Sequence, residues 1–272
     1  RYLSREKNTA ITILDRAVLG KNYLKNLSDF DLIFRSPGVP YRLPEIQQVR
    51  ERVSSLTKLF FQKAPGRIVG ITGSAGKTTT ATLLYRILKN AGKKVFLAGN
   101  VGINPLGLLP RLDRHSLVVM ELSSFQLEDL TQSPQVAIVL DIYEEHLDKH
   151  RNFKEYLAAK SNLTKHQRSS DVVIYSRDNR FSKKLARLSP GKKIPVSISG
   201  GKKIGYRLKL AGEHNYLNVM AARAAARFLG ASEKIIKKTA ENFSGLEHRL
   251  ELVLEKGVVR YFNNSKATNP SS

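Results

Sequence analysis

The chain has 272 residues, enough for about two domains, and 41% of them are hydrophobic, which is sufficient for a buried core. It has no cysteine, which excludes disulfides and thiolate metal sites. Neither an apolar run of about 18–20 residues nor a signal peptide occurs in it. We therefore expect a cytoplasmic protein without a membrane partner.

The charge is strongly basic, with 46 Lys and Arg against 23 Asp and Glu, a formal net charge of +23. Such a balance suggests nucleic acid or another polyanion as partner. The basic residues, however, occur as short scattered pairs such as Lys93-Lys94 and Lys237-Lys238. Scattered pairs are typical of a solvated surface, so a nucleic-acid partner is not expected, and polyanion affinity stays an alternative.

Residues 1–63 are predicted to hold two short strands and one helix, at 10–14, 32–36 and 44–59. Between the second strand and the helix lies Ser36-Pro37-Gly38-Val39-Pro40, a turn whose two prolines and glycine restrict the backbone. Residues 62–66 resemble a linker. A domain boundary is therefore expected near residue 63.

The most informative segment reads Ile-Val-Gly-Ile-Thr-Gly-Ser-Ala-Gly-Lys-Thr-Thr from residue 68. An apolar strand here runs into a glycine-rich turn and then a helix, an arrangement whose backbone N–H groups can hold phosphates. Lys77 would contact the β- and γ-phosphates, and the Thr78 hydroxyl can reach Mg²⁺. The predicted phosphate loop consists of Gly73, Ser74, Ala75, Gly76, Lys77, Thr78 and Thr79. A chance glycine turn before a helix is the alternative.

Strands then alternate with helices, which predicts a mostly parallel α/β sheet with its ligand at the carboxyl ends of the strands. The predicted strands are 68–72, 95–98, 117–122, 136–141, 172–176 and 194–197. The predicted helices are 78–90, 154–166, 213–229 and 232–242. Residues 192–209 are expected to form loops and short edge strands. A hairpin is expected from 250–254 and 257–262.

Two polar residues near the strand ends could serve a divalent cation, and a lysine lies on a helix that follows. Glu121 ends an apolar run, His146 follows another, and Lys160 lies on a predicted helix. A hard cation beside Thr78 needs oxygen or imidazole ligands, which Glu121 and His146 supply. Each has a plainer alternative: Glu121 as a helix cap, His146 as a structural histidine, and Lys160 as a solvated lysine.

The order of motifs along the chain resembles that of the Mur ligases. The motifs are the phosphate loop, GNVG, ELSSFQLE, EEHLDKH, EYLAAK, GEHNYLNVMAA, GLEHRLE and NNSKATN. ELSSFQLE, HRLE and SKATN are most similar to the members that add D-glutamate to UDP-N-acetylmuramoyl-L-alanine in peptidoglycan synthesis. The resemblance implies these two substrates, an ATP-dependent C–N ligase and an acyl-phosphate intermediate.

The resemblance also implies the cofactors and the residues that hold them. ATP and two Mg²⁺ ions are expected, with Thr78 and Glu121 on the first ion and His146 and Lys160 on the second. Because an ammonium repels a cation, Lys160 is expected to be carbamylated. The implied catalytic residues are Lys77, Glu121, His146 and Lys160. The implied nucleotide contacts outside the loop are Asn215, Asn218, His248, Arg249, Lys266 and Thr268, and the implied substrate contacts are Ser36, Pro37, Gly38, Asn100 and Ser123.

Some positions depart from the family pattern. Glu145 stands where an aspartate is usual, so the carboxylate beside His146 reaches one methylene further. Asn264 also replaces a usual aspartate, which removes a negative charge near the expected position of the nucleotide ribose. A simple proline turn stays the alternative for the segment at Ser36.

The resemblance implies an α/β fold with a P-loop ATPase domain at 64–245. This domain would lie between incomplete Rossmann-like domains at 1–63 and 246–272. Because the rest of the C-terminal domain would supply the D-glutamate pocket, we expect the chain alone to bind Mg·ATP weakly without ligase turnover. The open alternatives for function are another Mur or folylpolyglutamate-type ligase, or a non-catalytic nucleotide-binding protein.

Overall fold

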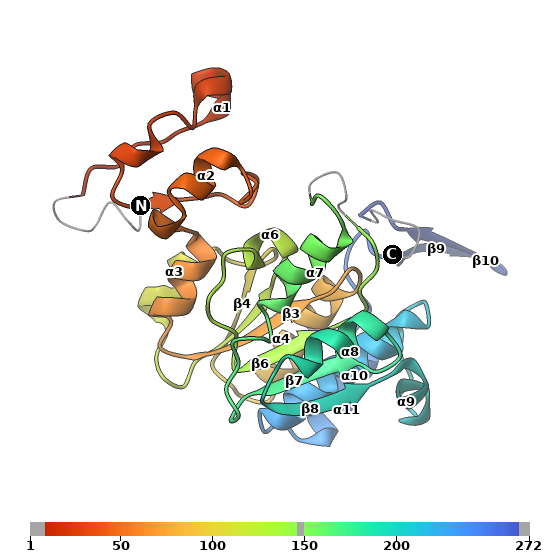
Figure 1. The fold of residues 1–272 in the computed structure, drawn as a ribbon. Helices are drawn as coiled ribbons and strands as arrows, with labels where there is room; N and C mark the ends of the chain where they lie inside the picture. The colour runs from red at the N-terminus through yellow and green to blue at the C-terminus, as the bar shows by residue number, and fades with distance from the viewer. Residues whose placement is uncertain (1–8, 146–149, 267–272) are drawn as a thin grey trace.

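The computed structural model describes residues 9–145 and 150–266. Its centre is a six-stranded sheet in the order β4-β5-β3-β6-β7-β8, and every neighbouring pair is parallel (Figure 1). The strands are β3 (Arg67–Thr72), β4 (Val95–Gly99), β5 (Leu117–Glu121), β6 (Val136–Val139), β7 (Val172–Ser176) and β8 (Lys192–Val196). The predicted α/β class and parallel sheet are confirmed.

Both faces of the sheet are buried, because side chains alternate along each strand. On β3 and β5, Val69 and Val119 join one hydrophobic cluster, while Ile68 and Val118 join the other. The first cluster packs against α4 (Lys77–Asn90), α10 (His214–Phe228) and α11 (Glu233–Asn242). The second packs against α3 (Leu56–Lys63), α7 (Phe153–Ser161) and α8 (Arg180–Arg187). The outcome is a three-layer domain.

Shorter elements complete the described chain. The remaining helices are α1 (Arg16–Leu19), α2 (Pro44–Gln48), α5 (Pro105–Leu108), α6 (Ser124–Leu127) and α9 (Ile198–Lys203). Single 3-10 turns occur at Gly20–Asn22, Leu27–Asp29, Arg50–Arg52 and Leu109–Arg111. β1 (Ile33–Phe34) pairs in parallel with β2 (Val53–Ser54), and β9 (Glu251–Lys256) forms the expected antiparallel hairpin with β10 (Val259–Asn263). Figure 1 shows the N-terminal elements above the sheet and the hairpin projecting from the domain.

Two sequence predictions in the N-terminal part are wrong. Residues 10–14 form no strand. The predicted helix at 44–59 is broken, because Val53 and Ser54 leave it to pair with β1. Ser55 then starts α3 by accepting a hydrogen bond from the Lys58 N–H at 3.1 Å, which makes it an N-cap.

Two later predictions also need correction. The helix predicted at 154–166 ends at Ser161, after which the Thr164 hydroxyl donates to the Leu185 carbonyl at 2.8 Å. Residues 192–209 contain the edge strand β8 and then the helix α9, instead of loops and short strands alone. At Gly201 this helix packs closely on α10, since a Cβ there would lie 2.7 Å from the Tyr216 Cβ. Glycine therefore permits a close approach that sequence periodicity did not reveal.

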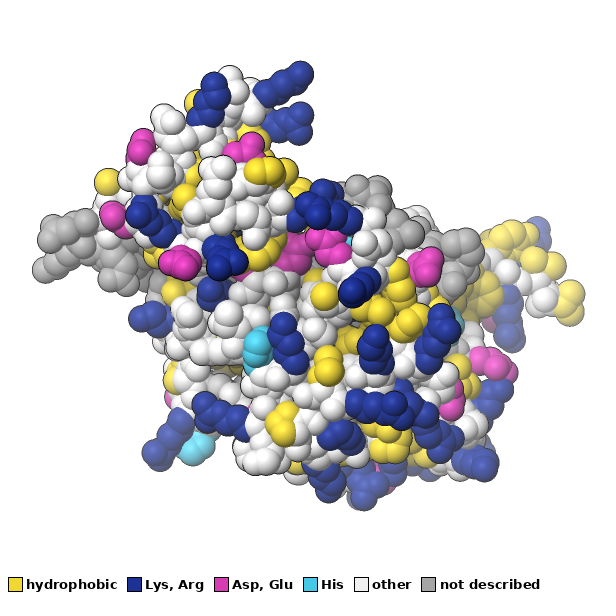
Figure 2. All heavy atoms as spheres, in the orientation of Figure 1, with side chains coloured by type: hydrophobic (Ala, Val, Ile, Leu, Met, Phe, Trp, Pro, Cys, Tyr) yellow, Lys and Arg dark blue, Asp and Glu magenta, His cyan; other side chains and the backbone are white. Residues whose placement is uncertain are grey.

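On the face that Figure 2 shows, the basic side chains do not gather into one strip. Figure 2 shows Lys and Arg side chains dispersed over the visible face and interleaved with uncharged groups. Among the described residues, none of the helices combines the length and apolar character needed to cross a membrane.

Candidate active site

The phosphate loop joins the carboxyl end of β3 to the start of α4, in the middle of the sheet. In the sheet, β4 and β5 lie on one side of β3 and β6 lies on the other, so the strand order switches direction at β3. Ligands of α/β sheets bind at such switch points. Gly76 has φ +80°, and a Cβ on it would lie 2.1 Å from the Asn218 Oδ1. Gly76 is therefore required both by its backbone conformation and by the close approach of α10.

A cavity of about 260 Å³ opens above this loop. Most of the residues predicted for nucleotide, cation or substrate line it: Ser74, Ala75, Gly76, Lys77, Thr78, Thr79, Asn100, Glu121, Ser123, Lys160, Asn215, Asn218, Arg249 and Lys266. They come from the phosphate loop and other strand ends, from the helices α4, α7 and α10, and from the segments on either side of the hairpin. The fold thus brings together groups spread over almost 200 positions of sequence.

The two lysines of the cavity converge on the loop backbone. The Lys77 Nζ donates to the carbonyls of Gly73 at 2.9 Å and Ser74 at 2.7 Å. The Lys160 Nζ donates to the Gly73 carbonyl at 2.9 Å and the Thr72 hydroxyl at 3.2 Å. Gly73 itself does not line the cavity, so its contribution is this carbonyl. The interpretation of Lys160 as a solvated lysine is wrong, because only 2% of the residue is exposed.

Burial governs the protonation of both lysines. Desolvation lowers the pKa of Lys77, against the opposing charges of Glu121 and Glu145. Desolvation lowers the pKa of Lys160 well below its ordinary value, and the charge of Lys77 lowers it further. The neutral amine of Lys160 is therefore favoured far more than in an exposed lysine.

Glu121 lies at the end of β5, is 3% exposed, and faces the cavity with one carboxylate oxygen unpaired. The Asn100 amide donates to its Oε1 at 3.4 Å, whereas its Oε2 is buried without a partner among the described residues. The capping alternative is wrong, since Ser123 caps α6 in a capping box with Gln126. An unpaired buried carboxylate oxygen is costly unless a cation or a donor completes it.

The two asparagines on α10 form a fixed pair behind the loop. The Asn218 amide donates to the Asn215 Oδ1 at 2.9 Å, and the Asn218 Oδ1 accepts from the Thr80 hydroxyl at 3.3 Å. The Asn215 amide donates in turn to the Ala211 carbonyl at 2.6 Å. This arrangement ties α10 to the first turn of α4 and presents amide groups at the cavity.

Some predicted residues lie elsewhere. Ser36, Pro37 and Gly38 do not line the cavity; they belong to the N-terminal turn. His248 does not line it either: its N–H donates to Glu251 at 2.8 Å and its Nδ1 lies 2.8 Å from the Asn263 amide. His146 and Thr268 lie outside the described residues.

The structure adds cavity residues that the sequence did not single out: Ser124, Tyr156, Leu210, His214, Gly245, Leu246 and Leu250. Glu145 and Asn264, the two departures from the family pattern, also line the cavity. Tyr156 is fully buried, and its hydroxyl contacts the Ser74 Oγ at 3.1 Å and the Glu145 Oε2 at 3.1 Å. Its four-residue spacing from Lys160 was a usable signal, because such residues share a helix face. Leu210 and Leu246 carried no comparable signal.

Comparisons with known proteins agree with this geometry. Residues 71–203 match the family model of the Mur ligase middle domain. The chain is 37% identical to UDP-N-acetylmuramoylalanine–D-glutamate ligase of Acetivibrio thermocellus, over 93% of this chain and 59% of that protein. It is 35% identical to the ligase of the same name from Clostridium kluyveri, over 98% of this chain and 61% of that protein. The chain thus spans about 60% of the length of these relatives.

Solved structures give the same picture. The fold is similar to MurF from Acinetobacter baumannii, with a TM-score of 0.63 and 25% identity, over 79% of this chain and 54% of that one. It is also similar to MurF ligase from Thermotoga maritima in complex with ADP, with a TM-score of 0.60 and 21% identity, over 79% of this chain and 59% of that one.

Proposed function

We propose that this chain, whose residues 71–203 match the Mur ligase middle domain, supplies the ATP-dependent chemistry of a D-glutamate-adding ligase. ATP would phosphorylate the carboxylate of UDP-N-acetylmuramoyl-L-alanine, and the amine of D-glutamate would displace phosphate to form an amide. The observation that carries the proposal is the unpaired Glu121 Oε2 in a cavity that also holds the phosphate loop, the half-buried Lys77 and the buried Lys160. The names of the relatives support the choice of substrates.

The loop residues would hold and polarise the phosphates. Backbone N–H groups at the start of α4 would face the phosphates, and the helix dipole favours negative charge there. The Lys77 ammonium, now bound to the Gly73 and Ser74 carbonyls, would exchange these bonds for phosphate oxygens. Since the reaction gathers negative charge at one centre, positioning and electrostatics would supply most of the rate.

The cavity suits Mg²⁺ at Glu121. Among the described residues, no three His, Cys, Asp or Glu side chains cluster as a metal site, so a cation would also need oxygens of Thr78 and of the phosphates. Bound Mg²⁺ would neutralise charge on the phosphate oxygens. The unpaired oxygen of Glu121 is what such an ion would satisfy, while Asn100 holds the other oxygen.

Lys160 would serve as a carbamate. A neutral amine attacks the carbon of CO₂ and loses a proton, which leaves an anionic oxygen ligand in place of an ammonium. The burial that lowers the pKa of Lys160 favours the neutral amine that this step needs. A carbamate would also bring a negative charge next to Lys77 and so remove the repulsion between the two cations.

The remaining residues divide by their place in the fold. We propose that Asn215, Asn218, Arg249 and Lys266 contact the nucleotide, and that Asn100 and Ser123 face the acyl group. We propose the turn at Ser36 as the UDP contact, because it lies outside the nucleotide cavity. The same division assigns 1–63 to the UDP domain, 64–245 to the ATPase domain and 246–272 to the start of the ligase domain.

The test is a phosphate-release and product assay over D-glutamate, L-alanine, L-lysine and a folate, run on this chain and on a longer protein that contains it. D-Glutamate alone should support product formation. Preference for another acceptor would assign the chain to a sister ligase. Nucleotide binding without turnover in the longer protein, together with salt-sensitive polyanion affinity, would favour the non-catalytic alternative.

A further inference from the structure

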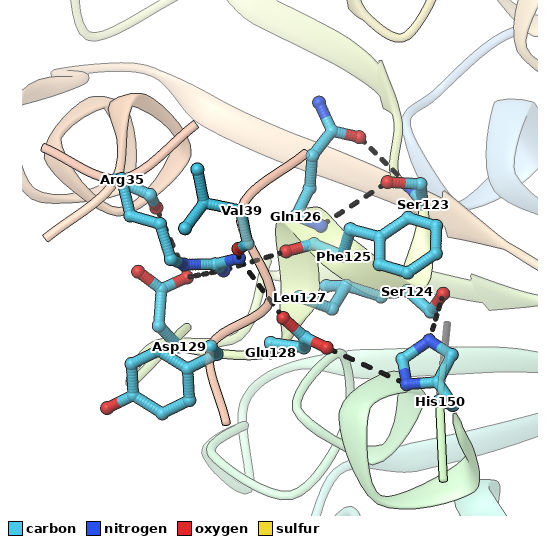
Figure 3. A network of polar contacts seen from close by, with 12 residues as sticks. Arg35, Val39, Ser123, Ser124, Phe125, Gln126, Leu127, Glu128, Asp129 and His150 are labelled. Atoms are coloured by element: carbon cyan, nitrogen blue, oxygen red, sulfur yellow. Dashed lines mark hydrogen bonds and ion pairs between the residues drawn. The ribbon is translucent and has the colours of Figure 1, made fainter. Parts of the chain in front are cut away.

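A buried arginine links the N-terminal turn to the wall of the cavity. Only 1% of the Arg35 side chain is exposed, and it lies directly before Ser36-Pro37-Gly38 (Figure 3). Its Nη1 donates to the Val39 carbonyl of that turn at 2.6 Å. Its Nη2 donates to the Phe125 carbonyl on α6 at 3.1 Å. One guanidinium therefore holds both segments at once.

Two carboxylates after α6 balance this charge. The Glu128 Oε2 lies 3.2 Å from the Arg35 Nη1, and the Asp129 Oδ1 lies 3.7 Å from the Nη2. Asp129 also accepts from the Ser55 hydroxyl at 3.2 Å. Buried ion pairs add little net stability, but their strict geometry can fix one arrangement of neighbouring segments.

The network continues from Glu128 to the cavity. The Glu128 Oε1 lies 3.6 Å from the His150 Nδ1, and the His150 Nε2 lies 3.0 Å from the Ser124 Oγ (Figure 3). The His150 ring stacks on Phe125 with 5.0 Å between ring centroids and an interplanar angle of 2°. Ser124 lines the cavity beside Ser123.

The direction of the hydrogen bond between Ser124 and His150 depends on which ring nitrogen of His150 carries the proton. A carboxylate on the Nδ1 side favours a proton on Nδ1, which leaves Nε2 as an acceptor. The Ser124 hydroxyl then donates to His150, and its lone pairs stay available to donors in the cavity. The ring stack and the hydrogen bond both contact the imidazole, one on its face and one at Nε2.

We propose that Arg35, Glu128 and His150 are positioning residues that connect the turn at 36–40 to Ser124. The two ends of this network are the UDP contact and the nucleotide cavity, an assignment that rests on the proposed function. A ligand that holds the turn against α6 keeps the contacts among Arg35, Glu128 and His150 in place. It thereby preserves the orientation of Ser124. The UDP-sugar and Mg·ATP therefore favour each other's binding, and this coupling is reciprocal.

The experiment measures that coupling by titration calorimetry. The affinity of the chain for a non-hydrolysable ATP analogue with Mg²⁺ is measured with and without saturating UDP-N-acetylmuramoyl-L-alanine. Wild type should bind the analogue about fivefold more tightly, or better, when the UDP-sugar is present. His150→Phe keeps the ring stack but loses both polar contacts, and Ser124→Ala removes the hydroxyl. The ratio of the analogue's affinity with the UDP-sugar to its affinity without it should fall to about one in both variants. The affinity for the UDP-sugar alone should stay within about twofold of wild type.

A third variant tests the turn end of the network, and a fourth is the control. Arg35→Lys keeps the charge but cannot reach Val39 and Phe125 together, so it should also lower the ratio. Arg16→Met, on the exposed helix α1, should keep the wild-type ratio. A ratio of one in wild type, or a wild-type ratio in His150→Phe, would overturn the network while leaving the proposed function intact. If wild type binds neither ligand, the proposed function is wrong and the inference that depends on it is withdrawn.

Discussion

Lys77 and Lys160 donate hydrogen bonds to the same carbonyl oxygen, that of Gly73, and each bond is 2.9 Å long. Two lysines at one acceptor repel each other, and the charge of Lys77 contributes to the lowered pKa of Lys160. This repulsion is relieved when an anion enters the cavity or when Lys160 is neutralised. The pair therefore favours anionic ligands before any ligand contact is considered.

Lys77→Ala should weaken Mg·ATP binding at least tenfold, because charge-assisted hydrogen bonds contribute about 1.5–3 kcal/mol. The lysine now contacts only loop carbonyls, so the fold should survive. Calorimetric titration with Mg·ATP measures the affinity, and circular dichroism checks the fold. Lys89→Ala, exposed on the same helix, is the control and should bind as wild type does. Equal affinity in both variants would contradict the phosphate-loop assignment.

Lys160→Met should stabilise the protein without ligand, by about 1 kcal/mol or more near pH 7, because it removes a buried cation. No acceptor is abandoned: Gly73 keeps its bond from Lys77, and the Thr72 hydroxyl keeps its bond to the Leu122 carbonyl. Urea unfolding in buffer freed of CO₂ measures the difference.

The pH dependence of this difference has a definite sign. The folded pKa of Lys160 is lowered from the ordinary value of 10.5, so the unfolded chain binds more protons between the two values. Wild-type stability therefore rises with pH through this interval. The advantage of Lys160→Met should be largest at low pH and should vanish as the pH approaches 10.5. An advantage that does not change with pH would contradict the lowered pKa.

Carbamylation of Lys160 can be detected without enzyme turnover. With ¹³C-labelled bicarbonate, the wild-type chain should show a carbamate carbon resonance, because the neutral amine is favoured at this site. The resonance should be absent in Lys160→Met and should persist in Lys89→Ala. In an active form of the protein, Lys160→Ala should lose activity and a short carboxylic acid should restore part of it. A variant as active as wild type would exclude a role for the carbamate.

Glu121→Gln should separate the effects of Mg²⁺ and nucleotide. Without a carboxylate charge, the Mg²⁺-dependent gain in ATP affinity should fall at least tenfold, since an ionised oxygen is a far better Mg²⁺ ligand than an amide. Affinity for ATP in the presence of a chelator should stay equal or improve. Titrations with and without Mg²⁺ measure both quantities, and Glu144→Gln, at an exposed position, is the control. A retained Mg²⁺ effect would place the ion elsewhere.

Gly76→Ala and Gly92→Ala form a matched pair, because both glycines have positive φ but only Gly76 is crowded. Gly92→Ala should cost only the strain of the left-handed backbone, about 1 kcal/mol. Gly76→Ala should cost at least twice that, because its Cβ would push Asn218 away from Thr80. Urea unfolding compares the two, and Mg·ATP affinity should fall only in Gly76→Ala. Similar losses of unfolding free energy in the two variants would mean that Asn218 and α10 move away from Gly76 at little cost.

The parallel sheet and the phosphate loop could be predicted from the sequence alone, and the order of the motifs indicated the family that the chain resembles. These depend on local features: apolar runs for Ile68 and Val118, a glycine turn ending at Gly76, and helical spacing in α4 and α10. Local patterns failed where a distant partner competed with the helix. Val53 does not belong to the predicted helix, because it pairs in a parallel strand with Ile33, 20 positions earlier in the sequence.

Only the tertiary structure decided the state of the charged groups. Lys160 is buried, which an ordinary helical lysine is not. Glu121 has an unpaired oxygen, which a carboxylate that caps a helix would not have. The tertiary structure also revealed the roles of Arg35, which lies in none of the motifs, and of His150, which ends the EEHLDKH motif but was not expected to be a site residue. Desolvation and pairing depend on what surrounds a side chain in space, and spacing along the chain does not encode those surroundings.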